Sequence, residues 1–250
     1  NFAQGVAFVC KKLDIPCTIV VPTHAPEAKR SAILRINSGV TLKSMEMSEY
    51  WDSLVNERVA GSEECVFISP VTNPYCMAGN GTIALEILEQ LPATVDTNEL
   101  AVLVPYGGGA MTLGICIAMK SINPNVQVYA VEVETACPLK ASLDAGEPTE
   151  VNFQPSFVDG IGSKAVFPSN FNRLKGMVNG SLVVSLKEVS QAIKHLVERN
   201  HIVAEGAGAA SVAAAIRYNQ AELKNKTIVS VVSGGNIDAC KLVQILNNEL

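Results

Sequence analysis

Three consecutive glycines follow a strand-like apolar run, and their backbone could bind an anion. Gly107, Gly108 and Gly109 come directly after residues 100–105 and before an apolar helical pattern. Glycine has no Cβ, so its N–H groups can approach an anion closely, and a new helix adds unpaired donors and its positive dipole end. An unliganded turn would explain one or two glycines. Three in a row favour a bound phosphate group.

A second turn of this kind lies near the end of the chain. Ser233, Gly234 and Gly235 follow the apolar run 227–232 and precede the helical stretch 237–246. In an open α/β sheet, the turns at the carboxyl ends of the strands converge on one crevice. We therefore expect both turns to contact the same ligand.

Composition excludes several classes of partner. The 250 residues are 48% hydrophobic and 17% charged, with a formal net charge of −5 and no basic run longer than a pair. Aromatic residues make up only 5%, so we expect no nucleic-acid partner, and no apolar run is long enough for a membrane span. Seven scattered cysteines without a C-x-x-C pair and only three histidines predict a reduced, cytoplasmic protein and disfavour a zinc site.

The first seventy residues alternate between helical and strand patterns. Asn1 can cap a helix over residues 1–13, and Ser48 can cap another over 48–61. We expect a further helix over 26–37 and strands over 16–22, 40–43 and 65–68. The proline-rich break at 69–74 predicts a domain boundary, which gives domains 1–72 and 73–250.

The same alternation continues after this break. A helix over 78–91 and a strand over 126–131 flank the glycine turn and its strand, whereas 139–174 has no clear period. Ser185 and Glu188 form a capping-box pattern for a helix to residue 199, and Glu205 opens a helix of small residues. Strands that alternate with helices in this way predict an α/β protein with mostly parallel sheets.

Six short motifs follow one another in an order that is typical of one group of enzymes, and they occupy residues 1–5, 73–86, 104–109, 159–160, 205–208 and 233–236. The chain resembles the threonine/serine dehydratase and serine racemase group of fold type II pyridoxal-phosphate enzymes, and the resemblance covers the whole chain. It implies a tryptophan synthase beta-like fold, with two three-layer αβα domains and open sheets. It also implies pyridoxal 5′-phosphate as cofactor and a small first domain that closes on an amino-acid substrate.

The resemblance assigns roles to individual residues. Ser233 would contact the pyridine nitrogen, where a neutral hydroxyl cannot hold the nitrogen protonated as a carboxylate would. Ala110 stands where the family usually has a fourth glycine, which would strain the turn only if this residue needs a positive φ. The implied cofactor-binding residues are Asn1, Gly107, Gly108, Gly109, Ala110, Glu205 and Ser233, and the implied substrate-binding residues are Phe2, Asp159 and Gly160.

Simpler interpretations exist for two of these residues. Asn1 taken alone is a helix cap, and Glu205 taken alone is a carboxylate at the positive end of a helix.

Serine racemase-like relatives bind a divalent cation through a glutamate at Glu132, a carbonyl at Ala136 and an acid two residues later. Here that last position is Pro138, so Glu132 and Ala136 are only weak candidates for a metal site.

The family's Schiff-base lysine lies upstream of the position that Asn1 matches. None of the thirteen lysines of the chain stands in the matching context. The resemblance therefore predicts a catalytic lysine before residue 1, no catalytic residue within the chain, and no activity of this chain alone.

The predicted function is that of an L-threonine/L-serine ammonia-lyase, which forms a 2-oxo acid and ammonia and acts as a homodimer or homotetramer. One alternative is a serine racemase-like isomerase, and another is a non-catalytic truncated homologue. A nicotinamide-dependent oxidoreductase fits less well. Its fingerprint needs a third glycine where this chain has Thr112, although Glu132 or Glu134 could mimic its acidic residue.

Overall fold

The structure is a computed structural model that describes all 250 residues, and it contains two compact units. The first comprises residues 1–70 and 236–242, and the second comprises 71–235 and 243–250. The division falls after Pro70, two residues before the boundary that the sequence predicts. The return of residues 236–242 to the first unit was not predicted. No helix has the length and apolar character that crossing a bilayer requires.

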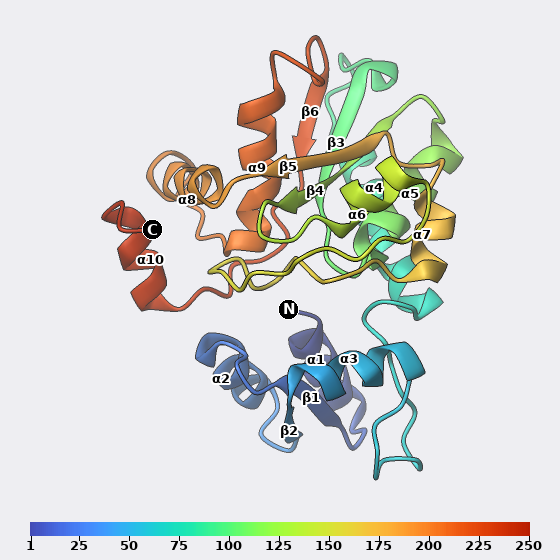
Figure 1. Cartoon of the computed structure of the whole chain (residues 1–250), viewed down its shortest axis with the longest axis vertical. Helices are drawn as coiled ribbons and strands as arrows, with labels where there is room; N and C mark the ends of the chain where they lie inside the picture. The colour runs from blue at the N-terminus through green and yellow to red at the C-terminus, as the bar shows by residue number, and fades with distance from the viewer. The chain divides into compact units, whose positions relative to one another are not determined.

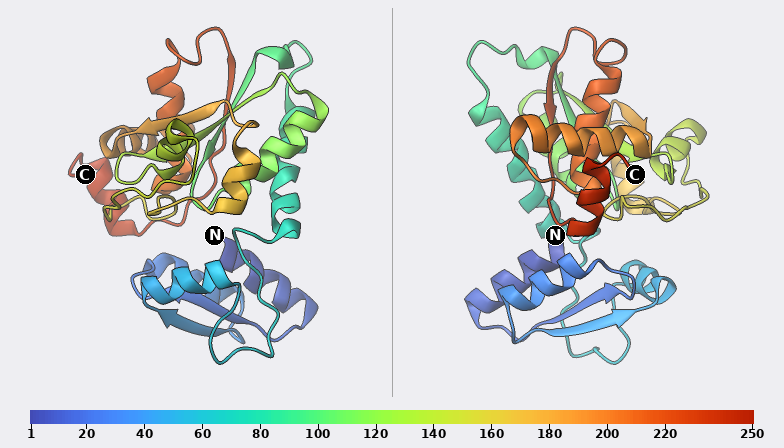
Figure 2. Two further views of the ribbon diagram at one scale, coloured as in Figure 1. Left: turned by 45° about the vertical axis from the view of Figure 1, so that its right-hand side comes forward. Right: turned by 90° about the vertical axis from the view of Figure 1, so that its left-hand side faces the viewer.

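The first unit contains a two-stranded parallel sheet with helices (Figures 1 and 2). Its strands pair in register from Thr18 opposite Thr41 to Pro22 opposite Met45. The core is formed by Ala7, Ile19, Val21, Ile33 and Val40. The elements are α1 (Phe2–Leu13), β1 (Thr18–Pro22), α2 (Glu27–Ile36), β2 (Thr41–Met45) and α3 (Met47–Asn56).

Three expectations for this unit were wrong. Residues 65–68 form no strand, and Val66 is 88% exposed. An apolar run becomes a strand only where a neighbouring strand can pair with its backbone N–H and C=O groups, and this run has no such neighbour. Ser48 lies inside α3 and does not cap it, because the N-cap is Glu46. The helix ends at Asn56, where the next residue, Glu57, adopts a left-handed φ of 51°. Asn1 precedes α1 but makes no capping bond, and its Oδ1 instead accepts a hydrogen bond from Asn236 Nδ2.

The second unit is built on a parallel four-stranded sheet in the order β5-β4-β3-β6 (Figure 1). This arrangement confirms the predicted α/β class. Its strands are β3 (Leu100–Pro105), β4 (Gln127–Val133), β5 (Gly180–Val184) and β6 (Thr227–Ser230). Its helices are α4 (Pro74–Gln90), η1 (Thr97–Glu99), α5 (Ala110–Ile122), α6 (Pro138–Ala145), α7 (Pro168–Leu174), α8 (Leu186–His195), the π turn η2 (Leu196–Asn200) and α9 (Gly206–Tyr218). The last helix, α10 (Ala239–Leu246), has residues in both units.

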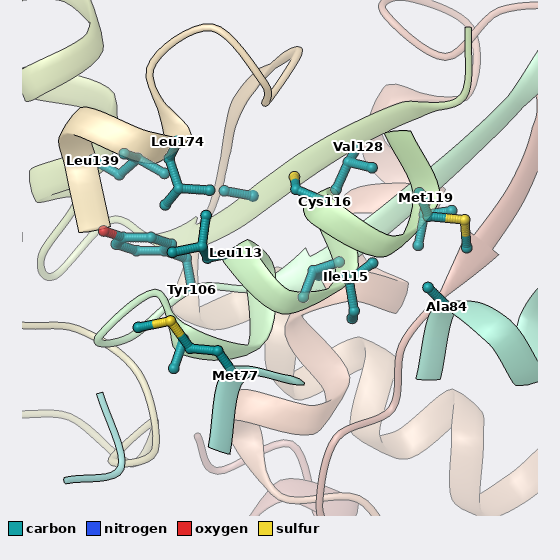
Figure 3. Close-up of a cluster of buried hydrophobic side chains, with 14 of the residues drawn as sticks. Met77, Ala84, Tyr106, Leu113, Ile115, Cys116, Met119, Val128, Leu139 and Leu174 are labelled. Carbon is teal, nitrogen blue, oxygen red and sulfur yellow. The ribbon is translucent and has the colours of Figure 1, made fainter. Parts of the chain in front are cut away.

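Helices cover both faces of this sheet (Figure 2). On one face, Leu100, Val102 and Val104 of β3 belong to a buried cluster with side chains of α4 and α5. Figure 3 shows this cluster, with Ala84 of α4 and Met119 of α5 among its labelled members. Because successive strand residues point to opposite faces, Ala101 and Leu103 face the other side, where α9 packs against all four strands. Every residue of β3 is buried, which makes it the centre of the unit.

Local signals explain where the remaining elements begin. The Asn73 side chain accepts hydrogen bonds from the backbone N–H groups of Tyr75 and Cys76, so α4 starts at Pro74 rather than at residue 78 as expected. The stretch expected to lack a clear period, 139–174, overlaps two short helices, α6 and α7, and each of them has a proline at its first position. Strand β5 was not predicted. The capping box of Ser185 and Glu188 is confirmed at the start of α8.

Candidate functional site

The glycine turn joins the central strand to a buried helix. Gly109 is the N-cap of α5 and has a φ of 90°, which an L side chain rarely adopts. Ala110 is the first residue of α5 and has no positive φ. Alanine at the family's usual fourth glycine position therefore causes no backbone strain.

The turn presents a row of backbone donors. None of the backbone hydrogen bonds has its donor at Gly107, Gly108, Gly109 or Ala110, although Gly109 and Ala110 are buried. Buried N–H groups nearly always have an acceptor, and the start of a helix favours a negative one. The residues therefore fit a phosphate group, as the sequence predicts.

The serine turn leaves the neighbouring strand at the same edge. Strand β6 pairs with β3 in parallel, and just beyond it Val231 N donates to Leu103 O at 3.0 Å. Adjacent strands lie about 4.8 Å apart, so Ser233 and Gly107 follow neighbouring strand ends. The two turns thus face the same edge of the sheet, and one small ligand could contact both.

Two further candidates from the sequence, Gly160 and Glu205, lie between these turns. A Cβ at Gly107 would lie 3.4 Å from Gly160 O, and a Cβ at Gly160 would lie 3.3 Å from Glu205 Oε1. Glu205 is 2% exposed, and its N–H donates to Gly234 O at 3.0 Å. Gly160 therefore connects the glycine turn to the start of α9, and α9 connects to the serine turn. Asp159 precedes Gly160 and is exposed.

Two candidates belong to the first unit. Asn1 and Phe2 stand at the start of α1, and the Phe2 side chain is 38% exposed. The roles of Asn1 and Phe2 stay predictions.

The buried side chain of Glu132 holds secondary-structure elements together through hydrogen bonds. Its Oε1 accepts from Leu139 N at 2.8 Å, and its Oε2 accepts from Lys140 N at 2.8 Å and Ser181 Oγ at 2.6 Å. Burial raises the pKa of Glu132 to about 7, although the three donors oppose this shift. The carboxylate caps α6 and links it to β4 and β5. Ala136, the other residue considered for a metal, is buried, and no group of three or more His, Cys, Asp or Glu residues could hold a metal ion.

Sequence reasoning missed a buried amide at the glycine turn. Asn170 of α7 is 1% exposed, and its Nδ2 donates to Gly108 O at 2.8 Å and to Val71 O at 3.0 Å. Pro168 could have signalled the helix that carries it. No local pattern signals a contact between residues 62 positions apart.

Tyr106 packs under the turn and holds an unpaired hydroxyl. The ring lies among Leu113, Leu139 and Leu174 (Figure 3), the residue is 1% exposed, and its hydroxyl has no hydrogen-bond partner. Burial, together with the charge of Glu132, raises the pKa of Tyr106, so the hydroxyl stays protonated.

A Tyr106→Phe substitution should therefore stabilise the protein by about 1 kcal/mol, because it removes a buried polar atom that forms no hydrogen bond. Thermal unfolding of the two proteins measures this difference. A clear loss of stability in Y106F would mean that the hydroxyl has a partner, such as a buried water molecule.

The fold and the site define the class of pyridoxal-phosphate enzymes with parallel α/β sheets. The family model described as "Pyridoxal-phosphate dependent enzyme" matches residues 1–234, and the chain belongs to this family. The chain is 37% identical over 250 residues to an L-threonine ammonia-lyase of Thermotoga maritima. The alignment covers all of this chain but only 60% of that relative's length.

Solved structures agree with this assignment. The processed form of threonine deaminase isoform 2 from Solanum lycopersicum is 29% identical, with a TM-score of 0.84 over 99% of this chain and 70% of that one. Maize serine racemase is 28% identical, with a TM-score of 0.82 over 99% of this chain and 75% of that one. These likenesses confirm the predicted fold type.

Proposed function

We propose that this protein is a pyridoxal-phosphate-dependent ammonia-lyase that converts L-threonine or L-serine to a 2-oxo acid and ammonia. The observation that carries the proposal is the pair of turns at one sheet edge, of which one offers unpaired backbone donors and the other a hydroxyl. The ammonia-lyase named among the relatives supports this reaction over racemisation.

The residues present suggest how the cofactor would be held. The N–H groups of Gly107 to Ala110 would bind its phosphate, and the dipole of α5 would stabilise the negative charge. The Ser233 hydroxyl would donate to or accept from the pyridine nitrogen. Glu205 lies close to the serine turn, and its burial would exclude water from that side of the ring.

When bound, pyridoxal phosphate supplies an electron sink that makes the Cα–H of an amino acid acidic. The neutral hydroxyl of Ser233 would keep this sink weak, which favours loss of the β-hydroxyl group over a long-lived carbanion. Gly160 and Asp159 would form a turn against the substrate. The resemblance assigns Asn1 to the ring hydroxyl, Phe2 to the substrate carboxylate and proton abstraction to a lysine that precedes the position of Asn1.

Replacing Gly109 by alanine should weaken binding of pyridoxal phosphate at least tenfold, which corresponds to about 1.4 kcal/mol. The substitution forces a side chain onto a φ of 90° and places its Cβ 3.0 Å from Tyr106 Cε2, so the donors would shift. Titration followed by ³¹P NMR measures the affinity. Gly176→Ala is the control, because Gly176 also has a positive φ, of 119°, with open space around it. Equal affinities in both variants would contradict a phosphate site at the turn.

Turnover of the full-length gene product tests the reaction itself. Release of ammonia and a 2-oxo acid from L-threonine or L-serine is expected, and only minor formation of D-serine. D-serine as the main product would favour the racemase alternative, and no product from either amino acid would favour a non-catalytic homologue. Fluorescence titration with a nicotinamide dinucleotide tests the oxidoreductase alternative.

We also propose a cytoplasmic homodimer or homotetramer, as the resemblance implies. Light scattering of the purified full-length gene product measures its mass in solution, and cell fractionation tests its compartment.

A further inference from the structure

We infer that Asn170 is a positioning residue that sets the direction of the phosphate-binding N–H groups in the glycine turn. The inference rests on the proposed function, because it concerns how the proposed cradle is held. Asn170 acts through the backbone of the turn, since both Nδ2 hydrogens of its amide donate to backbone carbonyls.

The amide joins two segments that are far apart in the sequence. Its two Nδ2 hydrogens go to Gly108 O at 2.8 Å and to Val71 O at 3.0 Å, over sequence separations of 62 and 99 residues. Asn170 is 1% exposed, so these bonds are shielded from water. The reversed amide would place Oδ1 against two carbonyl oxygens, so the partners fix which end donates.

Holding the Gly108 carbonyl also fixes the following N–H group. In a trans peptide, the C=O of Gly108 and the N–H of Gly109 point in opposite directions. With the carbonyl bound to Asn170, the Gly109 N–H must point away from α7. Gly109 N is one of the donors without an acceptor in the chain. The amide thus orients a donor that it does not touch.

Packing prevents the turn from relaxing around this bond. A Cβ at Gly108 would lie only 2.6 Å from Val71 Cγ2, so the Val71 side chain lies directly against the turn, and Asn170 holds both residues. Phe171 and Leu174 are buried at 1% and 0% exposure and anchor α7 in the core. Since α7 packs on α5, the same helix supports the turn and the helix that follows it. A site held by such supporting residues keeps its donors in place before the ligand arrives.

The test compares phosphate recognition in Asn170→Asp and Asn172→Asp. Asn170→Asp preserves shape but replaces the donor by a carboxylate that faces two carbonyl oxygens. Asn172 lies on the same helix and is exposed, so N172D is the matched control. For each protein, the affinity for pyridoxal phosphate is divided by the affinity for pyridoxal, which lacks the phosphate. We expect this ratio to fall at least tenfold in N170D and to stay unchanged in N172D.

The ratio separates positioning from general damage, because a merely destabilised protein would lose affinity for both compounds. An unchanged ratio in folded N170D would overturn the inference and leave the proposed function intact. A wild-type protein that binds pyridoxal as tightly as pyridoxal phosphate would overturn both.

A measurement on the wild-type chain covers the case in which N170D does not fold. When inorganic phosphate accepts from Gly109 N–H, it polarises the peptide and strengthens the bond from Asn170 to Gly108 O. The side-chain amide resonances of Asn170 should then shift downfield together with the backbone resonance of Gly109. A shift at Gly109 with none at Asn170 would overturn the inference.

Discussion

Replacing Gly114 by alanine should lower the free energy of unfolding by about 3 kcal/mol, because the added methyl group has no space. Gly114 is buried on α5, where a Cβ would overlap Met77 O and lie 3.0 Å from Gly81 N of α4. In the reverse direction, a Cβ at Gly81 would lie 3.2 Å from Gly114 O. These neighbours are backbone atoms of a 17-residue helix, which cannot move aside as a flexible side chain could.

Thermal unfolding measures this effect, and the expected decrease in Tm is roughly 6–12 °C. Gly79→Ala is the matched control, because Gly79 also lies inside α4 but is exposed and has no neighbour within 4 Å. It should gain about 0.5–1 kcal/mol, since alanine is the better helix former. A G114A protein as stable as the wild type would show that α4 and α5 are not this close.

Replacing Glu132 by glutamine should destabilise the protein more at pH 5 than at pH 8. The folded pKa of Glu132 is about 7, above the ordinary value of 4.5, because the carboxyl is buried. Between these values the folded state holds a proton that the unfolded state releases, so stability falls as the pH rises through this range. At about 1.4 kcal/mol per unit, the contribution that disappears is about 3 kcal/mol. Glutamine does not titrate and lacks this dependence.

Denaturant unfolding of the two proteins from pH 5 to pH 8 gives the difference directly. Glutamine also turns an NH₂ group toward some of the donors from Leu139, Lys140 and Ser181, so a penalty should remain at pH 8. Glu134→Gln is the control, because Glu134 is exposed and its Oε1 accepts a hydrogen bond from Leu186 N at 2.8 Å. A larger penalty for E132Q at pH 8 than at pH 5 would show that the donors outweigh burial and depress the pKa.

Sequence alone predicted the parts of the fold whose signals are local. The glycine turn, the capping box of Ser185 and Glu188, and the small-residue helix after Glu205 each depend on a few adjacent residues. The expected strand at 65–68 was wrong because a strand also needs a partner, which no local pattern supplies. The helices α6 and α7 were missed because seven or eight residues are too few to show a period.

The candidate site likewise contains residues that local motifs indicate and residues that only the packing of the fold brings to it. Gly109 and Ser233 could be proposed from their own motifs, and the pairing of β3 with β6 then places their turns at one sheet edge. The bonds of Asn170 to Gly108 and Val71 could not be proposed, because they depend on how α7 packs in the core. The same holds for the three donors around Glu132, which the sequence presented only as a weak metal candidate.

The late return of residues 236–242 to the first unit has a consequence for synthesis on the ribosome. The backbone N–H of Ala28, in the first turn of α2, donates to Asp238 Oδ1 at 3.0 Å, and Asn236 donates to Asn1. These partners emerge some two hundred residues after α2. During synthesis, the backbone N–H of Ala28 and the side chain of Asn1 therefore lack these partners until nearly the whole second unit has been translated.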